Sequence, residues 1–270
     1  MNTIATLHQL RQRLGLDTAD TADDDRLLDA LQAATAQIER LAGRRFTPRL
    51  ATVEHSVNPV DTSELTLDDD LLELTTLTNG NGSVVSSADI VILPDSGGDN
   101  PIGIIRLTGG NSFVWDETPL RAIQINGIWG YHDHWSEAWR DSSDTVQDNP
   151  FGASATTLTV ADADGTDAES ETPRFQVGQL LRIESEYLPV LAINTATNVL
   201  TVARAVNGTT AASHAQDTLI EVFQPPLDVE MLALQWAAWL YKEPDNRVTG
   251  GIPLRFLEWL RGLRRVGVKA

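Results

Sequence analysis

Apolar residues recur at helical spacing near the start of the chain. Leu7, Leu10 and Leu14 fall on one helical face, and Gly15 follows as a natural stop. Thr6 has a glutamine three residues later, which is the spacing of a capping box. The pattern therefore predicts a short helix that begins after Thr6.

A second and longer apolar stripe predicts a helix from roughly Asp24 to Ala42. Its members follow one another at spacings of four, three, four and three residues: Leu27, Leu31, Ala34, Ile38 and Leu41. The linker "DTADTADDD" places acids at the positive N-terminal end of this helix, and Gly43 is expected to close it.

The pattern changes after Pro48 to short runs of β-forming residues. Residues 50 to 132 alternate or cluster such residues between glycine- and asparagine-rich turns, which predicts an antiparallel β region. Ile123, Ile125, Trp129 and Tyr131 alternate, so we expect the last strand to continue to the following histidines. The polar, turn-rich "SEAWRDSSDTVQDNPFGAS" then predicts a boundary. Residues 153–223 read as five short strands, which suggests a small barrel or sandwich.

Helical periodicity returns after Pro225 and Pro226. One predicted helix carries Leu232, Trp236, Trp239 and Leu240 on one side, and Pro244 is expected to end it. "RVTGG" is predicted to be a flexible link, and Pro253 suits the first position of the last helix. The last stripe is Phe256, Trp259, Leu260 and Leu263. We expect these aromatic residues to serve the core or an interface: Trp236, Trp239, Trp259 and Phe256.

The order of these elements predicts an α+β fold. The simplest packing brings the N- and C-terminal helices together as a small bundle, with an antiparallel β region and a small β-barrel or sandwich module inserted between them. The predicted domains are residues 1–50 and 224–270 for the helical core, 51–140 for the β region, and 150–223 for the barrel or sandwich module.

Charge and composition exclude several classes of protein. Thirty-eight acids against twenty bases give a net charge of −18, which disfavours binding to nucleic acid by phosphate neutralisation. Cysteine is absent, which excludes disulfides, thiol catalysis and thiolate zinc sites and suits a reducing cytoplasm. No window resembles a membrane span, and the first fifteen residues do not resemble a secretory signal.

The C-terminal end is basic although the chain is acidic. From Arg255 onward there are five bases against one acid. Such an end can be a docking arm, or its cations can simply complement a helix dipole. The candidate docking residues are Arg261, Arg264, Arg265 and Lys269.

Sequence motifs for chemistry are weak. His132 and His134 in "GIWGYHDHW" would share one face of a strand, yet a zinc site needs at least one further ligand. Asp162, Asp164 and Asp167 resemble a calcium loop, but Gly165 falls at position four rather than six. No nucleophile elbow, P-loop or dinucleotide-binding fingerprint occurs. We therefore expect no cofactor, metal or catalytic residue.

Three segments together carry a resemblance to a known family. The N-terminal pattern ends in a turn formed by Gly43, Arg44, Arg45 and Phe46, and it resembles the opening of tailed-bacteriophage head–tail adaptor (connector) proteins. The stretch from "LTLDDDLLELTTLTNGNG" to "AIQINGIWGYHDHW" looks like the middle of long adaptor variants. Residues 175–220 resemble a β module that recurs in phage structural proteins. The matching positions there are Gly178, Glu186, Arg204, Asn207, Gly208, Thr209 and His214. Ala205 departs from that pattern, which commonly has glycine after the arginine.

The resemblance implies a structural virion protein rather than an enzyme. Adaptors form a ring of twelve subunits below the portal protein at the capsid vertex, in the neck of the virion. The ring extends the DNA channel without specific DNA binding and offers a platform to a stopper, tail-terminator or tail protein below. Assembly would take place in the host cytoplasm, with no membrane involved.

Other readings of the sequence remain open at this point. The chain could be another tail or head-completion protein built on the same β module. The β part and its tryptophans could instead form a carbohydrate- or receptor-binding module, which a glycan array would detect. A metal-dependent hydrolase that uses His132 and His134 would require stoichiometric zinc.

Overall fold

The computed structural model describes residues 3–17, 20–95, 100–242 and 251–265 of the chain. By its internal contacts the chain divides into two compact units. The first unit combines Met1–Gly43 with Glu137–Arg265, and the second unit is Arg44–Ser136. Each unit is described by itself below.

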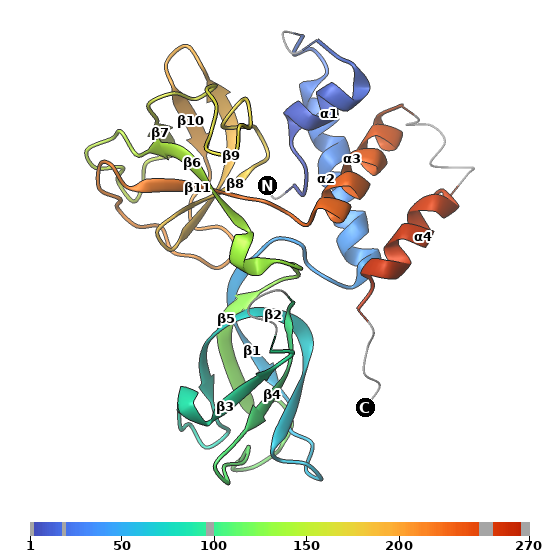
Figure 1. Cartoon of the computed structure of the whole chain (residues 1–270), viewed down its shortest axis with the longest axis vertical. Helices are drawn as coiled ribbons and strands as arrows, with labels where there is room; N and C mark the ends of the chain where they lie inside the picture. Colours follow the sequence, from blue (N-terminus) through green and yellow to red (C-terminus); the bar gives the residue numbers. More distant parts are fainter. Residues whose placement is uncertain (1–2, 18–19, 96–99, 243–250, 266–270) are drawn as a thin grey trace. The chain divides into compact units, whose positions relative to one another are not determined.

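Four helices from the two ends of the chain form the helical core of the first unit (Figure 1). They are α1 (Leu7–Leu14), α2 (Asp24–Ala42), α3 (Leu227–Lys242) and α4 (Leu254–Leu263). Helix α2 packs against both α3 and α4, and α1 contacts α2 and α3. The predicted packing of the N- and C-terminal helices is therefore confirmed, as is the α+β class. None of the helices in the described part of the chain is long and apolar enough to cross a membrane.

Local sequence signals set the ends of the first two helices. The Thr6 hydroxyl accepts a hydrogen bond from the Gln9 amide, and the Gln9 side chain accepts one from the Thr6 amide, which completes the predicted capping box. Gly15 and Gly43 end α1 and α2 with φ values of +69° and +66°, the left-handed conformation that favours glycine. Pro253 precedes α4 rather than opening it. The expected helix end at Pro244 and the "RVTGG" link lie outside the described residues.

The first unit also contains a six-stranded antiparallel sheet, called the six-stranded module below. Its strands are β6 (Trp139–Thr145), β7 (Thr157–Thr159), β8 (Leu180–Ile183), β9 (Glu186–Asn194), β10 (Val199–Val202) and β11 (Leu219–Phe223). The strand order is β6-β11-β8-β9-β10-β7. The two outermost strands in this order are β6 and β7. The amide of Gln147, which follows β6, donates to the carbonyl of Thr159 on β7 at 3.0 Å. A core of aliphatic residues with two phenylalanines, Phe151 and Phe175, fills the module.

Strand β6 lies within the polar segment at residues 136–154, where the sequence predicted a boundary and no strand. Its inward-facing residues are Arg140, Ser142 and Asp144, all buried. Each has a specific partner. The Ser142 hydroxyl, for example, donates to the Ile220 carbonyl at 2.6 Å. Because polar side chains occupy the core-facing positions, hydrophobic alternation could not reveal this strand.

The second unit is a five-stranded antiparallel sheet around its own core. Its strands are β1 (Arg49–His55), β2 (Glu64–Thr78), β3 (Ile90–Leu93), β4 (Ile102–Leu107) and β5 (Ile123–Trp129), in the order β1-β5-β2-β4-β3. A short 3-10 helix, η1 (Ser87–Asp89), precedes β3. The Trp129 indole is buried, donates to the Ala51 carbonyl at 3.0 Å and stacks on His55. The antiparallel β region predicted from the sequence is thus present.

The segment after β5 differs from the prediction. The strand ends at Trp129, and Gly130 has a φ of +149°, so the chain leaves the sheet before Tyr131. The Tyr131 amide donates to the Arg45 carbonyl at 2.7 Å, and the Tyr131 ring packs edge-on against buried Phe46. The predicted strand continuation is therefore wrong, because the Gly43–Phe46 turn holds this segment instead.

Candidate functional site

The aromatic residues of the C-terminal helices form one stacked cluster in the helical core. Trp236 and Phe256 are fully buried, and their rings stack with centroids 5.0 Å apart. Trp239 packs edge-on against Phe256 at 6.0 Å and is half-buried, as is Trp259 on α4. The stacked rings of Trp236, Trp239 and Phe256 therefore fasten α3 to α4, and they reach the surface at Trp239. A role of Trp239 and Trp259 in an interface stays a prediction.

The basic residues predicted as a docking tail lie at and after the end of α4. Arg261 and Arg264 are exposed, and Arg265 is half-buried. The Arg265 amide lies 3.4 Å from the carbonyl of Ala42, the last residue of α2. Lys269 lies outside the described residues. Two cations of the predicted set thus face solvent.

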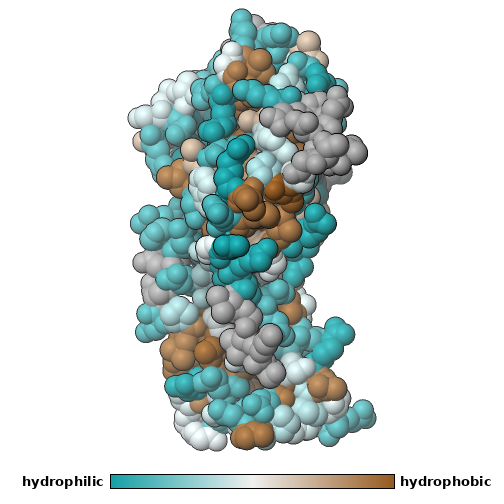
Figure 2. All heavy atoms as spheres, turned by 90° about the vertical axis from the view of Figure 1, so that its right-hand side faces the viewer, coloured by the Kyte–Doolittle hydropathy of each residue, from teal (hydrophilic) through white to brown (hydrophobic). Residues whose placement is uncertain are grey.

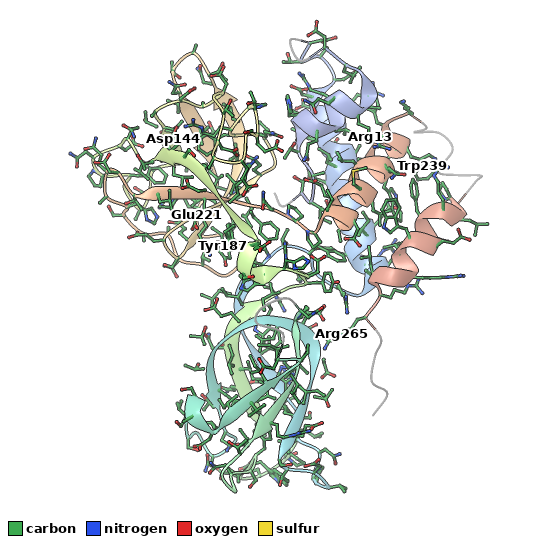
Figure 3. All side chains as sticks on the ribbon, viewed as in Figure 1. Arg13, Asp144, Tyr187, Glu221, Trp239 and Arg265 are labelled. Atoms are coloured by element: carbon green, nitrogen blue, oxygen red, sulfur yellow. The ribbon has the colours of Figure 1, made fainter. Side chains whose placement is uncertain are left out.

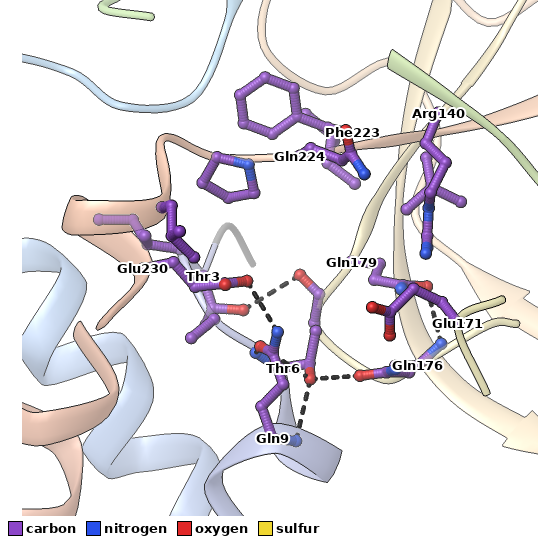
Figure 4. A pocket seen from close by; sticks show the side chains of 17 residues that line it. Thr3, Thr6, Gln9, Arg140, Glu171, Gln176, Gln179, Phe223, Gln224 and Glu230 are labelled. Atoms are coloured by element: carbon purple, nitrogen blue, oxygen red, sulfur yellow. Dashed lines mark hydrogen bonds between the residues drawn. The ribbon is translucent and has the colours of Figure 1, made fainter. Parts of the chain in front are cut away.

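A polar pocket of about 320 Å³ lies between the helical core and the six-stranded module (Figure 4). The N-terminal segment lines one side, where the Thr6 hydroxyl donates to the Gln176 side chain at 2.5 Å. The Thr3 hydroxyl donates to the Gly178 carbonyl at 3.1 Å. Gly178 has a φ of +100°, and a Cβ there would come within 2.6 Å of the Thr3 hydroxyl oxygen. Glycine is required at this position, because it lets the two parts approach closely.

Charged groups on the walls of this pocket are held by the protein itself. Gln9 donates to the Glu230 carboxylate at 2.8 Å. Burial raises the pKa of Glu230, and the hydrogen bond from Gln9 opposes this shift. Arg140 is buried and pairs with Asp167 at 2.5 Å. These charged groups of the pocket thus have partners within the helical core or within the module.

A buried ionic cluster occupies one end of the six-stranded module, and we call it the Glu186 cluster: Glu186, Arg204 and His214. Arg204 binds both carboxylate oxygens of Glu186 at 2.8 Å, in a bidentate pair. His214 lies 2.9 Å from the same carboxylate and 2.7 Å from that of Glu184. Carboxylates only accept, so this arrangement suits a ring that donates from both nitrogens.

The environment of Glu186 strongly favours its charged form. Burial alone raises the pKa of Glu186. The hydrogen bonds from Arg204, His214 and two backbone amides outweigh burial, and they lower the pKa to about 2. Arg204 also donates to the carbonyls of Gly152, Ala155 and Ala212. The cluster therefore ties three loops of the module together. Its members are residues that the family resemblance picked out, although their contact was not predicted.

The residues considered as metal ligands in the sequence either do not converge or form hydrogen bonds and ion pairs with other protein groups. His132 is buried, and its Nδ1 atom accepts a hydrogen bond from the His134 backbone amide at 2.9 Å, while His134 is exposed. Asp167 of the calcium-like loop pairs with Arg140. Within the described ranges, no group of three or more histidines, cysteines or acids is arranged to hold a metal ion.

Tryptophans of the β parts take part in packing. Trp139 stacks on Tyr187 with centroids 5.2 Å apart, and the Arg182 guanidinium lies 4.4 Å from the Trp139 ring centroid. Arg182 also forms a bidentate pair with Glu221. These contacts link four neighbouring strands, β6, β11, β8 and β9. Figure 3 labels Glu221 and Tyr187 in this part of the chain.

Comparison with solved structures gives a distant likeness. No family model matches the sequence, and no curated protein sequence does. A solved structure described as "Neck of empty GTA particle computed with C6 symmetry" contains a chain with 13% identity and a TM-score of 0.46 to this one. The match covers 98% of this chain and 92% of that chain. A TM-score this low supports no conclusion about fold or function.

Proposed function

We propose that this chain is a structural protein of a tailed-phage-type virion, a head–tail adaptor that forms a ring below the portal. The observation that carries the proposal is the shared helical core. Helices α1 and α2 pack against α3 and α4 although more than 180 residues separate α2 from α3 along the chain. This is the arrangement implied by the sequence resemblance, with both β parts inserted between the two ends of an adaptor core.

The charge of the chain supports a position around a DNA channel. A net charge of −18 repels phosphate and would let DNA slide through without sticking. In this proposal the ring has twelve copies, the portal protein lies above it, and a stopper, tail-terminator or tail protein lies below. The exposed Arg261 and Arg264, with Arg265 and Lys269, would dock on an acidic surface of the portal.

Interruption of the gene for this chain tests the proposal directly. We expect DNA-filled heads without tails, seen by electron microscopy, because the platform for the next neck protein is missing. Complete tailed particles from the interrupted strain would refute the proposal. The docking role of the tail is tested separately by deletion of residues 264–270. Full attachment to the portal after this deletion would refute the docking role of the tail and leave the rest of the proposal standing.

A further inference from the structure

Helix α3 exposes apolar groups on its outward side. Met231, Gln235 and Ala238 follow one another at spacings of four and three residues, so they lie on one side of the helix. Met231 is 37% exposed, and the other two are half-buried. The opposite side packs into the helical core through buried residues that include Trp236 and Leu240. Figure 2 faces the side on which Figure 1 draws α3 and α4, and apolar side chains gather there among hydrophilic ones.

This side of α3 forms the floor of a shallow groove on the helical core, with a volume of about 660 Å³. One lining residue comes from α1, four come from α3 and one comes from α4. They are Arg13, Gln235, Ala238, Trp239, Lys242 and Arg255. Because α1 and α4 border the floor, the groove has the form that binds one helix or one extended segment of a partner. Figure 3 labels Arg13 and Trp239, which mark its position.

The groove is basic although the chain as a whole is acidic. Its three charged side chains, Arg13, Lys242 and Arg255, are all exposed. Among the described residues, none of the three forms an ion pair. Glu258, three residues after Arg255 on α4, does not line the groove. Like charges held together repel one another, so an anionic group that enters the groove is stabilised.

Trp239 gives the groove an ordered apolar contact. Its ring is half-buried and packs edge-on against Phe256, with centroids 6.0 Å apart. Tryptophan and arginine are enriched among the residues that dominate binding at protein–protein interfaces. An ordered indole beside two arginines and a lysine therefore favours a protein partner that combines apolar and acidic side chains.

We propose that this groove binds an acidic, amphipathic segment of a different protein. Apolar side chains of the segment pack on Ala238 and the Trp239 ring, and its carboxylates neutralise the three cations of the groove. The inference goes beyond the proposed function and does not depend on it, because the partner is defined by its chemistry alone.

Other occupants fit the groove less well. Two grooves that face one another would place three cations opposite three cations. The outward side of α2 mixes exposed Asp25 and Asp29 with exposed Arg26 and Arg40, so it offers no acidic face to the groove of a second copy. Nucleic acid carries phosphates along its whole length, and the net charge of −18 repels it. A second copy bound through its acidic six-stranded module is the competing occupant, which the experiment below separates.

Photo-crosslinking in the cells that naturally produce the chain tests the inference. Gln235→p-benzoylphenylalanine places the crosslinking group on the floor of the groove, and Ala36→p-benzoylphenylalanine places it on the exposed side of α2 as a control. Mass spectrometry identifies the crosslinked peptides. We expect the group at Gln235 to join a segment of a different protein in which acids exceed bases by about three, to match the three cations. The group at Ala36 should not join that segment.

Charge reversal shows whether the cations of the groove make the contact. Arg255→Glu should lower the yield of this crosslink about tenfold, because it turns one attraction into a repulsion. The matched control is Arg40→Glu, an exposed arginine of α2 that does not line the groove, and it should leave the yield unchanged. The crosslinked segment, made as a synthetic peptide, should also bind the purified chain, and about tenfold more weakly after Arg255→Glu. Thermal melting checks that both variants fold.

Several results would overturn the inference. The group at Gln235 would then join only a second copy of the chain, or nucleic acid, or a segment without an excess of acids, or nothing. An equal loss with Arg40→Glu would overturn it as well, because the effect would come from charge in general. The proposed function fails separately, when the chain is missing from particles. The expected crosslink in cells whose particles lack the chain would support the inference and refute the proposed function.

Discussion

Replacement of Glu186 by glutamine should destabilise the six-stranded module more than removal of a charge from a partly exposed ion pair of the same module. Glu186 is fully buried and pairs with Arg204, whose side chain is 7% exposed. Glutamine keeps the size of the side chain but removes its charge, so the Arg204 guanidinium stays buried without a counter-ion. Loss of one partner of a buried pair typically costs about 3–5 kcal/mol.

The pH dependence gives a second measure of the same interaction. The pKa of Glu186 is lowered from 4.5 to about 2 in the folded chain. At 1.36 kcal/mol per unit, this shift corresponds to about 3 kcal/mol of stability. Because the folded-state pKa is the lower one, the contribution is complete above pH 4.5 and is lost as the pH falls towards 2. The difference between wild type and Glu186→Gln should therefore shrink over this range.

Hydrogen exchange read by mass spectrometry resolves the module from the rest of the chain. The matched control is Glu221→Gln, which breaks the bidentate pair with Arg182 at side chains that are 24% and 27% exposed. We expect that control to cost about 1 kcal/mol or less. The reasoning would be refuted if Glu186→Gln cost no more than Glu221→Gln at neutral pH. A difference that stays constant down to pH 3 would refute the linkage to ionisation.

Three further changes test local features of the fold, each by chemical denaturation. Ala205 has a φ of +53°, so Ala205→Gly should stabilise the chain by about 0.5–1 kcal/mol, and a loss of stability would contradict the left-handed conformation. Gly178→Ala should destabilise by about 2 kcal/mol or more, because its Cβ would clash with the Thr3 hydroxyl. Gly152→Ala, where a Cβ meets nothing within 4 Å, should change little, and equal effects at both glycines would exclude the close approach. Thr6→Ala removes both the capping box and the hydrogen bond to Gln176 and should cost about 1 kcal/mol or more, whereas an unchanged midpoint would show that both are dispensable.

Local signals predicted most of the elements of this fold. The capping residue Thr6 and the stops at Gly15 and Gly43 act within a few residues, so the sequence reveals them directly. Strand β6 escaped prediction because its inward positions are polar and find their partners on distant segments. Arg140 and Asp167, for instance, are 27 positions apart along the chain. The predicted division into separate domains stays a proposal. By its internal contacts, the chain has the helical core and the six-stranded module in one unit.

The candidate sites were less accessible from sequence than the fold. The resemblance marked Glu186, Arg204 and His214, but only the structure shows that they meet, across 18 and 28 positions of the chain. A shallow groove on the helical core likewise brings Arg13 and Arg255 together from opposite ends of the chain. No local pattern joins such residues, because tertiary packing alone brings them together.

The copy number of this chain in purified, DNA-filled particles tests the central claim most directly. Quantitative mass spectrometry against the portal protein of the same particles provides it. The proposed adaptor ring matches the portal ring copy for copy, so we expect a ratio near one to one. Absence of the chain from the particles, or a ratio far from one, would contradict its placement in the ring below the portal.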